Sequence, residues 1–146
     1  HQEARRQRQM CIRDRDSDGK IGDPAVGGTV RQMGNNIPDG WSGLDIGPGS
    51  AALFGDIIQE SKTVLWNGPM GVFEDTRFSA GTKHVAQSMA ENKTSFTVIG
   101  GGDSAAAAKE FKFDTGIDHV STGGGASLEL IEKGTLPGID ALLMNH

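Results

Sequence analysis

Two segments decide the fold of this chain: Ser95-Phe-Thr-Val-Ile-Gly-Gly-Gly-Asp-Ser104 and His119-Val-Ser-Thr-Gly-Gly-Gly-Ala-Ser-Leu-Glu-Leu130. In each, a short apolar run meets three consecutive glycines and a helix-forming segment follows, which predicts a strand, a turn and a helix. Glycine lets backbone N–H groups approach a ligand without a Cβ in the way, and the following helix directs its positive end at the turn. Two such turns at one sheet edge predict a polyanion site, most simply for nucleotide phosphates.

The same alternation continues on either side of these segments. Strands are predicted over residues 43–47, 63–66, 95–99 and 119–121, and helices over 51–60, 79–91, 103–112 and 126–133, with a last apolar turn or helix over 136–144. This order predicts an α/β fold: an incomplete Rossmann-like parallel sheet of about four strands with flanking helices. Right-handed crossovers would bring the turns 47–49, 67–74, 100–103 and 122–125 to the sheet edge where ligands bind.

The chain divides into three parts by composition. Residues 41–146 form the predicted partial nucleotide-binding domain, and residues 14–40, rich in Gly, Pro and Asn, are predicted to be a connector with at most one weak strand. Residues 1–13 carry four arginines and few apolar side chains, so we expect a disordered tail, foreign in origin, with no function. Asp14, Asp16, Asp18 and Gly19 fit the start of a calcium-binding EF-hand loop, but the final bidentate glutamate is replaced by Ala25, which argues against calcium.

Composition excludes several classes of function. The net charge of −5 argues against a general nucleic-acid partner. No apolar run approaches the roughly 20 residues that span a bilayer, so no membrane partner is expected and the predicted location is the cytoplasm. One cysteine in 146 residues excludes an internal disulfide.

The motifs together resemble phosphoglycerate kinase, over about residues 37–143. The matching segments are Ile37-Pro-Asp-Gly-Trp41, Leu44-Asp-Ile-Gly-Pro48, Trp66-Asn-Gly-Pro-Met-Gly-Val-Phe-Glu74, Ile99-Gly-Gly-Gly-Asp-Ser104, Ser121-Thr-Gly-Gly-Gly-Ala-Ser-Leu-Glu129 and Leu136-Pro-Gly-Ile139. They are similar to the last part of that family's nucleotide-binding domain. The resemblance implies phosphoryl transfer between ATP and 3-phosphoglycerate in glycolysis, with Mg²⁺ and ATP or ADP as cofactors and a monomeric parent enzyme.

The resemblance also implies the role of each site residue. Glu74 would hold the ribose hydroxyls, Asn67 would contact the phosphates, and Asp103 would be the acid associated with Mg²⁺. The backbone positions implied for catalysis are Gly102 and Gly125. The remaining implied nucleotide contacts are Pro69, Gly71 and Val72 along the nucleoside, and Gly101, Gly102, Ser104, Gly123 and Gly124 at the phosphates. Phosphoryl transfer needs positioning and charge stabilisation, which backbone N–H groups, helix ends and a metal-bound carboxylate supply.

Parts of the family pattern have no counterpart here. The substrate-binding N-terminal domain and the glycine-alanine-lysine turn with its phosphate-neutralising lysines have no match, and Lys109 and Lys112 fall well into their predicted helix. We therefore expect 3-phosphoglycerate to bind through the missing domain, and we expect the chain alone to lack kinase activity.

One alternative is an NAD(P)-binding oxidoreductase domain. Gly100, Gly102 and Ala105 fit G-x-G-x-x-A after a strand. The ribose-binding acid should then stand at the carboxyl end of the next strand. Asp118 has the right spacing but stands at the beginning of that strand, so it is expected at the wrong edge of the sheet.

Overall fold

The computed structural model describes residues 10–14, 30–33, 37, 39 and 41–143. Its strands form two sheets of different kinds. The antiparallel sheet has the order β2-β1-β3 and the parallel sheet the order β4-β5-β6. The strands are β1 (Met10–Asp14), β2 (Val30–Met33), β3 (Trp41–Ile46), β4 (Thr63–Asn67), β5 (Phe96–Gly100) and β6 (His119–Ser121). The helices are α2 (Pro48–Glu60), α3 (Ala80–Glu91), α4 (Gly102–Glu110), α5 (Gly124–Lys133) and α6 (Pro137–Leu143), with 3₁₀ turns at Thr76–Phe78 and Asp114–Gly116.

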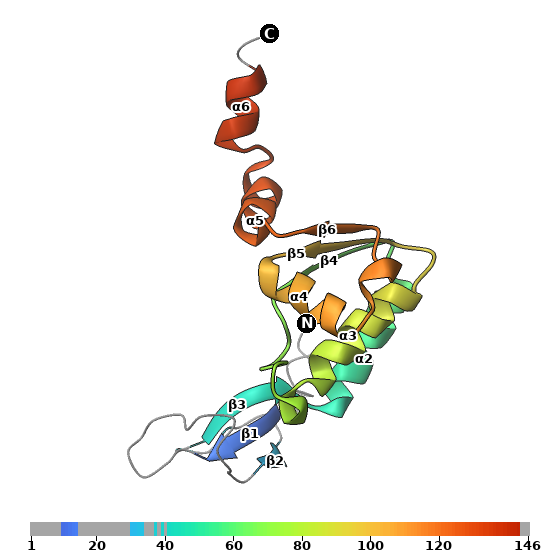
Figure 1. Cartoon of the computed structure of the whole chain (residues 1–146), viewed down its shortest axis with the longest axis vertical. Helices are drawn as coiled ribbons and strands as arrows, with labels where there is room; N and C mark the ends of the chain where they lie inside the picture. Colours follow the sequence, from blue (N-terminus) through green and yellow to red (C-terminus); the bar gives the residue numbers. More distant parts are fainter. Residues whose placement is uncertain (1–9, 15–29, 34–36, 38, 40, 144–146) are drawn as a thin grey trace.

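The parallel sheet confirms the predicted α/β class. Its three strands pair in register, so that Asn67 lies beside Gly100 and Gly100 beside Ser121. The carboxyl ends of β4, β5 and β6 therefore lie at one edge. Figure 1 shows α2, α3 and α4 on the same side of this sheet.

The first predicted strand of that sheet lies elsewhere. β3 exists, but it pairs antiparallel with β1, with Met10 opposite Ile46 and Asp14 opposite Trp41. The parallel sheet thus has three strands among the described residues, and the turn at residues 47–49 follows a strand of the other sheet. Sequence periodicity identified an extended segment there but carries no information about its partner, and antiparallel pairing with β1 takes the place of the expected parallel neighbour.

The N-terminal segment also differs from the sequence prediction. β1 occupies Met10–Asp14, where we expected a disordered tail up to residue 13 followed by a connector. Its backbone hydrogen bonds with β2 and β3 supply the order that its charged sequence did not suggest. Residues 1–9 and the candidate EF-hand segment 15–25 lie outside the described residues.

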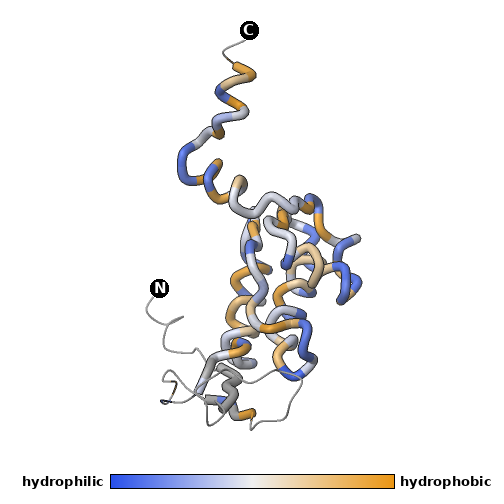
Figure 2. The backbone as a smooth tube through the Cα atoms, turned by 60° about the vertical axis from the view of Figure 1, so that its left-hand side comes forward, coloured by the Kyte–Doolittle hydropathy of each residue, from blue (hydrophilic) through white to orange (hydrophobic). Residues whose placement is uncertain are grey.

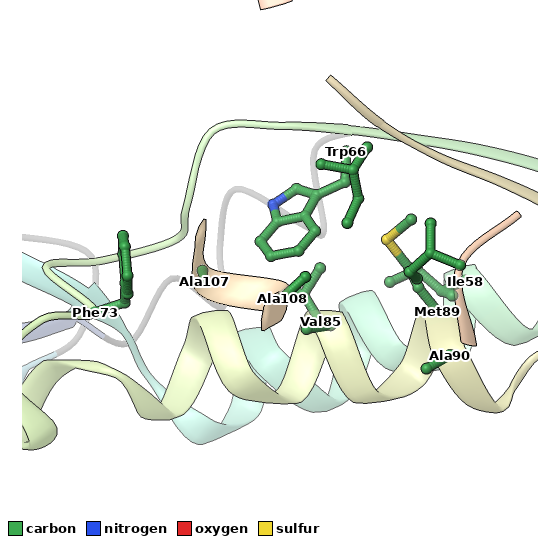
Figure 3. Packing of buried hydrophobic residues seen from close by; sticks show 11 residues of the cluster. Ile58, Trp66, Phe73, Val85, Met89, Ala90, Ala107 and Ala108 are labelled. Carbon is green, nitrogen blue, oxygen red and sulfur yellow. The ribbon is translucent and has the colours of Figure 1, made fainter. Parts of the chain in front are cut away.

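The core lies between the parallel sheet and its helices. Figure 3 shows Trp66 of β4 over α3, close to Val85 and Met89, and these side chains are 4%, 4% and 0% exposed. Val85 and Met89 are four residues apart, the spacing that places both on one face of a helix, as predicted. Ala107 and Ala108 bring α4 into the same cluster. This core fixes the sheet against α3 and so fixes the strand ends that carry the glycine turns.

Apolar surface remains uncovered on α2 and on the C-terminal helices, among other places. Along α2, Ile57 is 50% exposed and lines a groove of about 330 Å³ with Phe54, Val64 and Met70. The hydropathy colouring in Figure 2 shows further apolar positions along the C-terminal helices, which Figure 1 shows extending away from the sheet. None of the helices in the described part of the chain is both long and apolar enough to cross a membrane.

Candidate functional site

The site is built where the three parallel strands end. Gly101 N, just after β5, donates a hydrogen bond to Ser121 O at the end of β6 at 2.9 Å. Asn67 Nδ2, at the end of β4, donates to Gly124 O at 3.2 Å. Three predicted site residues from three successive strand-turn units, Asn67, Gly101 and Gly124, therefore lie together at one edge of the sheet.

The backbone geometry requires glycine at both Gly101 and Gly124. Gly101 has φ 103° and ψ 145°, a backbone conformation open essentially to glycine alone. A Cβ at Gly124 would lie 2.9 Å from Gly101 Cα and 3.0 Å from Asn67 Oδ1. The two glycine turns thus approach each other more closely than any pair of side chains would allow.

Each turn opens directly into a helix. α4 begins at Gly102 and α5 at Gly124, one and two residues earlier than predicted. The first N–H groups of a helix have no partner within it, and they carry its positive end. A Cβ at Gly102 or Gly125 would meet nothing within 4 Å, so the backbone there is open. The arrangement offers two adjacent sets of N–H donors to an anion such as a phosphate chain.

The loop after β4, residues 68–74, connects this edge to the other sheet. Gly68 N donates to Ser104 Oγ of α4 at 2.7 Å, beside the glycine turns. Further along, Val72 N donates to Leu44 O of β3 at 2.9 Å, and a Cβ at Gly71 would lie 2.5 Å from that oxygen. The start of the loop is therefore held by α4 and its later part by β3, with Glu74 exposed at its end.

Ser104 has a different environment from the one its predicted role requires. It is 0% exposed, and its hydroxyl accepts the Gly68 hydrogen bond. Asp103, its neighbour, is exposed in the first turn of α4, where an acid is stabilised by the helix dipole. Only Asp103 of the two is therefore placed to meet a ligand at the surface.

Asp118 is occupied at the opposite end of the sheet. Its Oδ2 accepts hydrogen bonds from Thr97 N at 2.8 Å and Thr97 Oγ1 at 2.9 Å, at the beginning of β5. These bonds favour the charged carboxylate and lower the pKa of Asp118. The acid that an oxidoreductase would use for the ribose is thus engaged away from the glycine turns, as the sequence indicated.

Asp103 is the residue at the site to which the sequence gave a metal role. No group of three or more His, Cys, Asp or Glu side chains that could hold a metal occurs in the described ranges. Asp103 is the acid in the first turn of α4. A single carboxylate suits Mg²⁺, which keeps several waters and is commonly bound by one or two carboxylates together with substrate phosphates.

Three groups that shape the site received no role from the sequence: Leu44 O, Asp45 and Thr82. Asp45 is 2% exposed, accepts from Gly81 N at 2.9 Å, and has a pKa raised by burial. Thr82 accepts from Met70 N and Gly71 N. Leu44 and Asp45 lay within a matched motif, but Thr82 is one threonine in the first turn of a helix and carried no signal.

Comparison with known sequences identifies the family. The sequence model for phosphoglycerate kinase matches residues 15–134. The chain belongs to the phosphoglycerate kinase family. A phosphoglycerate kinase from Trichodesmium erythraeum is 57% identical over 106 residues, and one from Corynebacterium urealyticum is 56% identical over 111 residues. These alignments cover 73% and 74% of this chain but only 27% and 28% of the two relatives. The chain thus spans about a quarter of the length of these kinases.

Solved structures agree with the sequence comparison. The phosphoglycerate kinase from Coxiella burnetii superimposes with a TM-score of 0.76 at 31% identity, covering 95% of this chain and 33% of that one. The enzyme from Pyrococcus horikoshii OT3 gives a TM-score of 0.62 at 30% identity, covering 82% and 28%. The α/β arrangement around the glycine turns is therefore shared with phosphoglycerate kinases.

Proposed function

We propose that this chain is the nucleotide-binding part of an enzyme that transfers a phosphoryl group between ATP and 3-phosphoglycerate. The observation that carries the proposal is the junction of Asn67, Gly101 and Gly124, which sets two helix N-termini side by side. In this proposal the backbone N–H groups of Gly102, Gly124 and Gly125 face the phosphates, with Gly102 and Gly125 nearest the transferred group. Gly101 and Gly123 shape the two turns around the phosphates, since their own N–H groups donate to Ser121.

The nucleoside would extend from this junction along the loop after β4. Pro69, Gly71 and Val72 would line it, and Glu74 would accept hydrogen bonds from two ribose hydroxyls, which suits an exposed carboxylate. Asp103 would hold Mg²⁺ together with the phosphate oxygens. When bound, Mg²⁺ would neutralise charge on the phosphates. The chain's own contribution is to orient the nucleotide and to supply N–H donors without reorganisation.

Titration with MgADP, MgATP and NAD tests the proposal. We expect weak binding of both adenine nucleotides to the 146-residue chain, with about tenfold loss for Glu74→Gln, since a hydrogen bond to a charged group contributes about 1.5–3 kcal/mol. Asp103→Asn should weaken MgADP more than ADP without metal. Binding of NAD with none of ADP would contradict the proposal and favour the oxidoreductase alternative.

We also propose that the chain by itself is inactive. The resemblance implies that 3-phosphoglycerate binds through a domain outside this chain, and the aligned part of the chain covers only 27% of the relative from Trichodesmium erythraeum. A coupled assay with ATP and 3-phosphoglycerate should detect no turnover. Turnover that Asp103→Ala abolishes would overturn this expectation.

A further inference from the structure

The loop at residues 68–74 contains no helix or strand, so its shape depends on where its backbone N–H groups find acceptors. Phe73 N donates to Gly71 O within the loop, and the acceptors that other elements supply are a serine hydroxyl in α4, a threonine hydroxyl in α3 and a carbonyl of β3. Two of the three are therefore side-chain hydroxyls that single substitutions can remove.

Thr82 makes the larger contribution. It is 0% exposed, and its Oγ1 accepts from Met70 N at 3.0 Å and from Gly71 N at 3.2 Å. The turn of α3 that carries Thr82 is itself anchored, because Gly81 N donates to the buried Asp45 carboxylate at 2.9 Å. One fixed oxygen thus holds two consecutive peptide groups in the middle of the loop.

Ser104 holds the loop at its beginning. Its buried hydroxyl accepts from Gly68 N at 2.7 Å, and Gly68 adopts φ 97° at the point where the chain leaves β4. The two hydroxyls lie on different helices and bind different peptide groups of the same loop. Neither is exposed to a ligand at the surface.

We propose that Thr82 is a positioning residue for nucleotide binding, which it supports through the loop and not through contact with the nucleotide. This inference rests on the proposed function, because the loop carries Pro69, Val72 and Glu74. Removing the Thr82 hydroxyl leaves two part-buried N–H groups without their acceptor, so the loop should open locally while the sheet stays folded.

The test compares Thr82→Val, which keeps the shape and removes the acceptor, with Thr82→Ser, which restores the hydroxyl. Thr97→Val is the matched control, because Thr97 is 1% exposed and uses its hydroxyl in the hydrogen bonds to Asp118 instead. Each variant of the whole chain is examined by amide hydrogen exchange and by MgADP titration.

For Thr82→Val we expect exchange at Met70 and Gly71 to accelerate at least tenfold, with β5 amides unchanged, and the MgADP Kd to rise about tenfold. Thr82→Ser should stay within about twofold of the unmodified chain in both measurements. Thr97→Val should leave both loop exchange and Kd unchanged. Unchanged loop exchange in Thr82→Val, or the same acceleration in Thr97→Val, would overturn the inference.

Failure of the proposed function gives a different result. If the unmodified chain and Glu74→Gln show no difference in MgADP binding, the nucleotide role of the loop is rejected. The exchange data then test only whether the Thr82 hydroxyl holds the loop in place. If Glu74→Gln weakens binding and Thr82→Val does not, the nucleotide site stands and the positioning role is rejected.

Discussion

Gly101 shows how a single residue determines the geometry of the site. Its φ of 103° and ψ of 145° fall in a region that side chains with a Cβ avoid, at a cost on the order of 1–3 kcal/mol. Gly102, the next residue, begins α4, and a Cβ there would meet nothing within 4 Å. Two adjacent glycines of one motif thus have different physical reasons to be glycine.

We therefore predict that Gly101→Ala lowers the free energy of unfolding by about 1–3 kcal/mol, while Gly102→Ala leaves it within about 1 kcal/mol or raises it. Urea unfolding of the two variants and the unmodified chain measures the difference. Equal losses in both variants would mean that the conformation of Gly101 is not the reason for its glycine.

Asp45 predicts a pH dependence of stability. Burial raises its pKa above the ordinary 3.8, so the folded chain holds this proton more tightly than the unfolded chain does. The resulting stabilisation is present below pH 3.8 and is lost as the pH rises through the folded-state pKa. Asp45→Asn has no carboxyl to titrate and therefore lacks this pH-dependent stabilisation. It also leaves Ile46 N or Gly81 N without an acceptor, which costs about 1–3 kcal/mol of unfolding free energy.

The stability advantage of the unmodified chain over Asp45→Asn should therefore shrink as the pH rises from 3.8. Unfolding free energies of both proteins, measured at increasing pH from 3.8 upward, test whether this advantage falls or rises with pH. An advantage that grows with pH would show that the hydrogen bonds to the carboxylate outweigh its burial.

The carboxyl ends of α4 and α5 illustrate what could be predicted at the scale of elements. Gly134, with φ 74°, caps the end of α5 at Lys133, and the sequence predicted that end from the glycine. α4 ends at Glu110, and Lys112 then adopts the same left-handed conformation with φ 61°. There Phe113 N donates to Ala108 O and Lys112 N donates to Lys109 O. A lysine gives no signal for this conformation, so its position could not be read from the sequence.

Replacing Lys112 by glycine should stabilise the chain. The left-handed conformation costs an ordinary residue about 1–2 kcal/mol, and glycine's greater freedom when unfolded offsets part of that gain, leaving about 0.5–1 kcal/mol. Lys109→Gly, in the last turn of the same helix, should destabilise by about 1 kcal/mol instead. Thermal or urea unfolding of both variants measures this, and a loss in Lys112→Gly would contradict it.

For the molecule as a whole, the sequence predicted which turns meet at the edge of the parallel sheet better than it predicted which strands form that sheet. Glycine triplets after apolar runs located two turns that do meet, at Gly101 and Gly124. The pairing of β3 with β1 could not be predicted, because strand patterns do not specify partners across distant segments. The anchoring of the loop by Thr82 was missed for the same reason: it depends on a contact made only after α3 packs against the sheet and β3.

The exposed apolar surface predicts how the whole chain behaves in solution. Leu142 and Leu143 of α6 are each 70% exposed and Ile131 of α5 is 67% exposed, on helices that extend away from the sheet (Figure 1). β4 and β6 each pair only with β5 among the described strands, which leaves both edges of this sheet unpaired there. Both features promote association between copies of a chain.

We predict that the 15.4-kDa chain associates as its concentration rises, and that Leu142→Glu combined with Leu143→Glu shifts this association to at least about threefold higher concentration. Light scattering coupled to size exclusion measures the mass across a dilution series. Lys133→Glu is the control, because it changes the net charge by the same amount but removes no apolar surface. If the control shifts association equally, charge repulsion and not the apolar surface of α6 is the cause; a 15.4-kDa mass at all concentrations would reject association altogether.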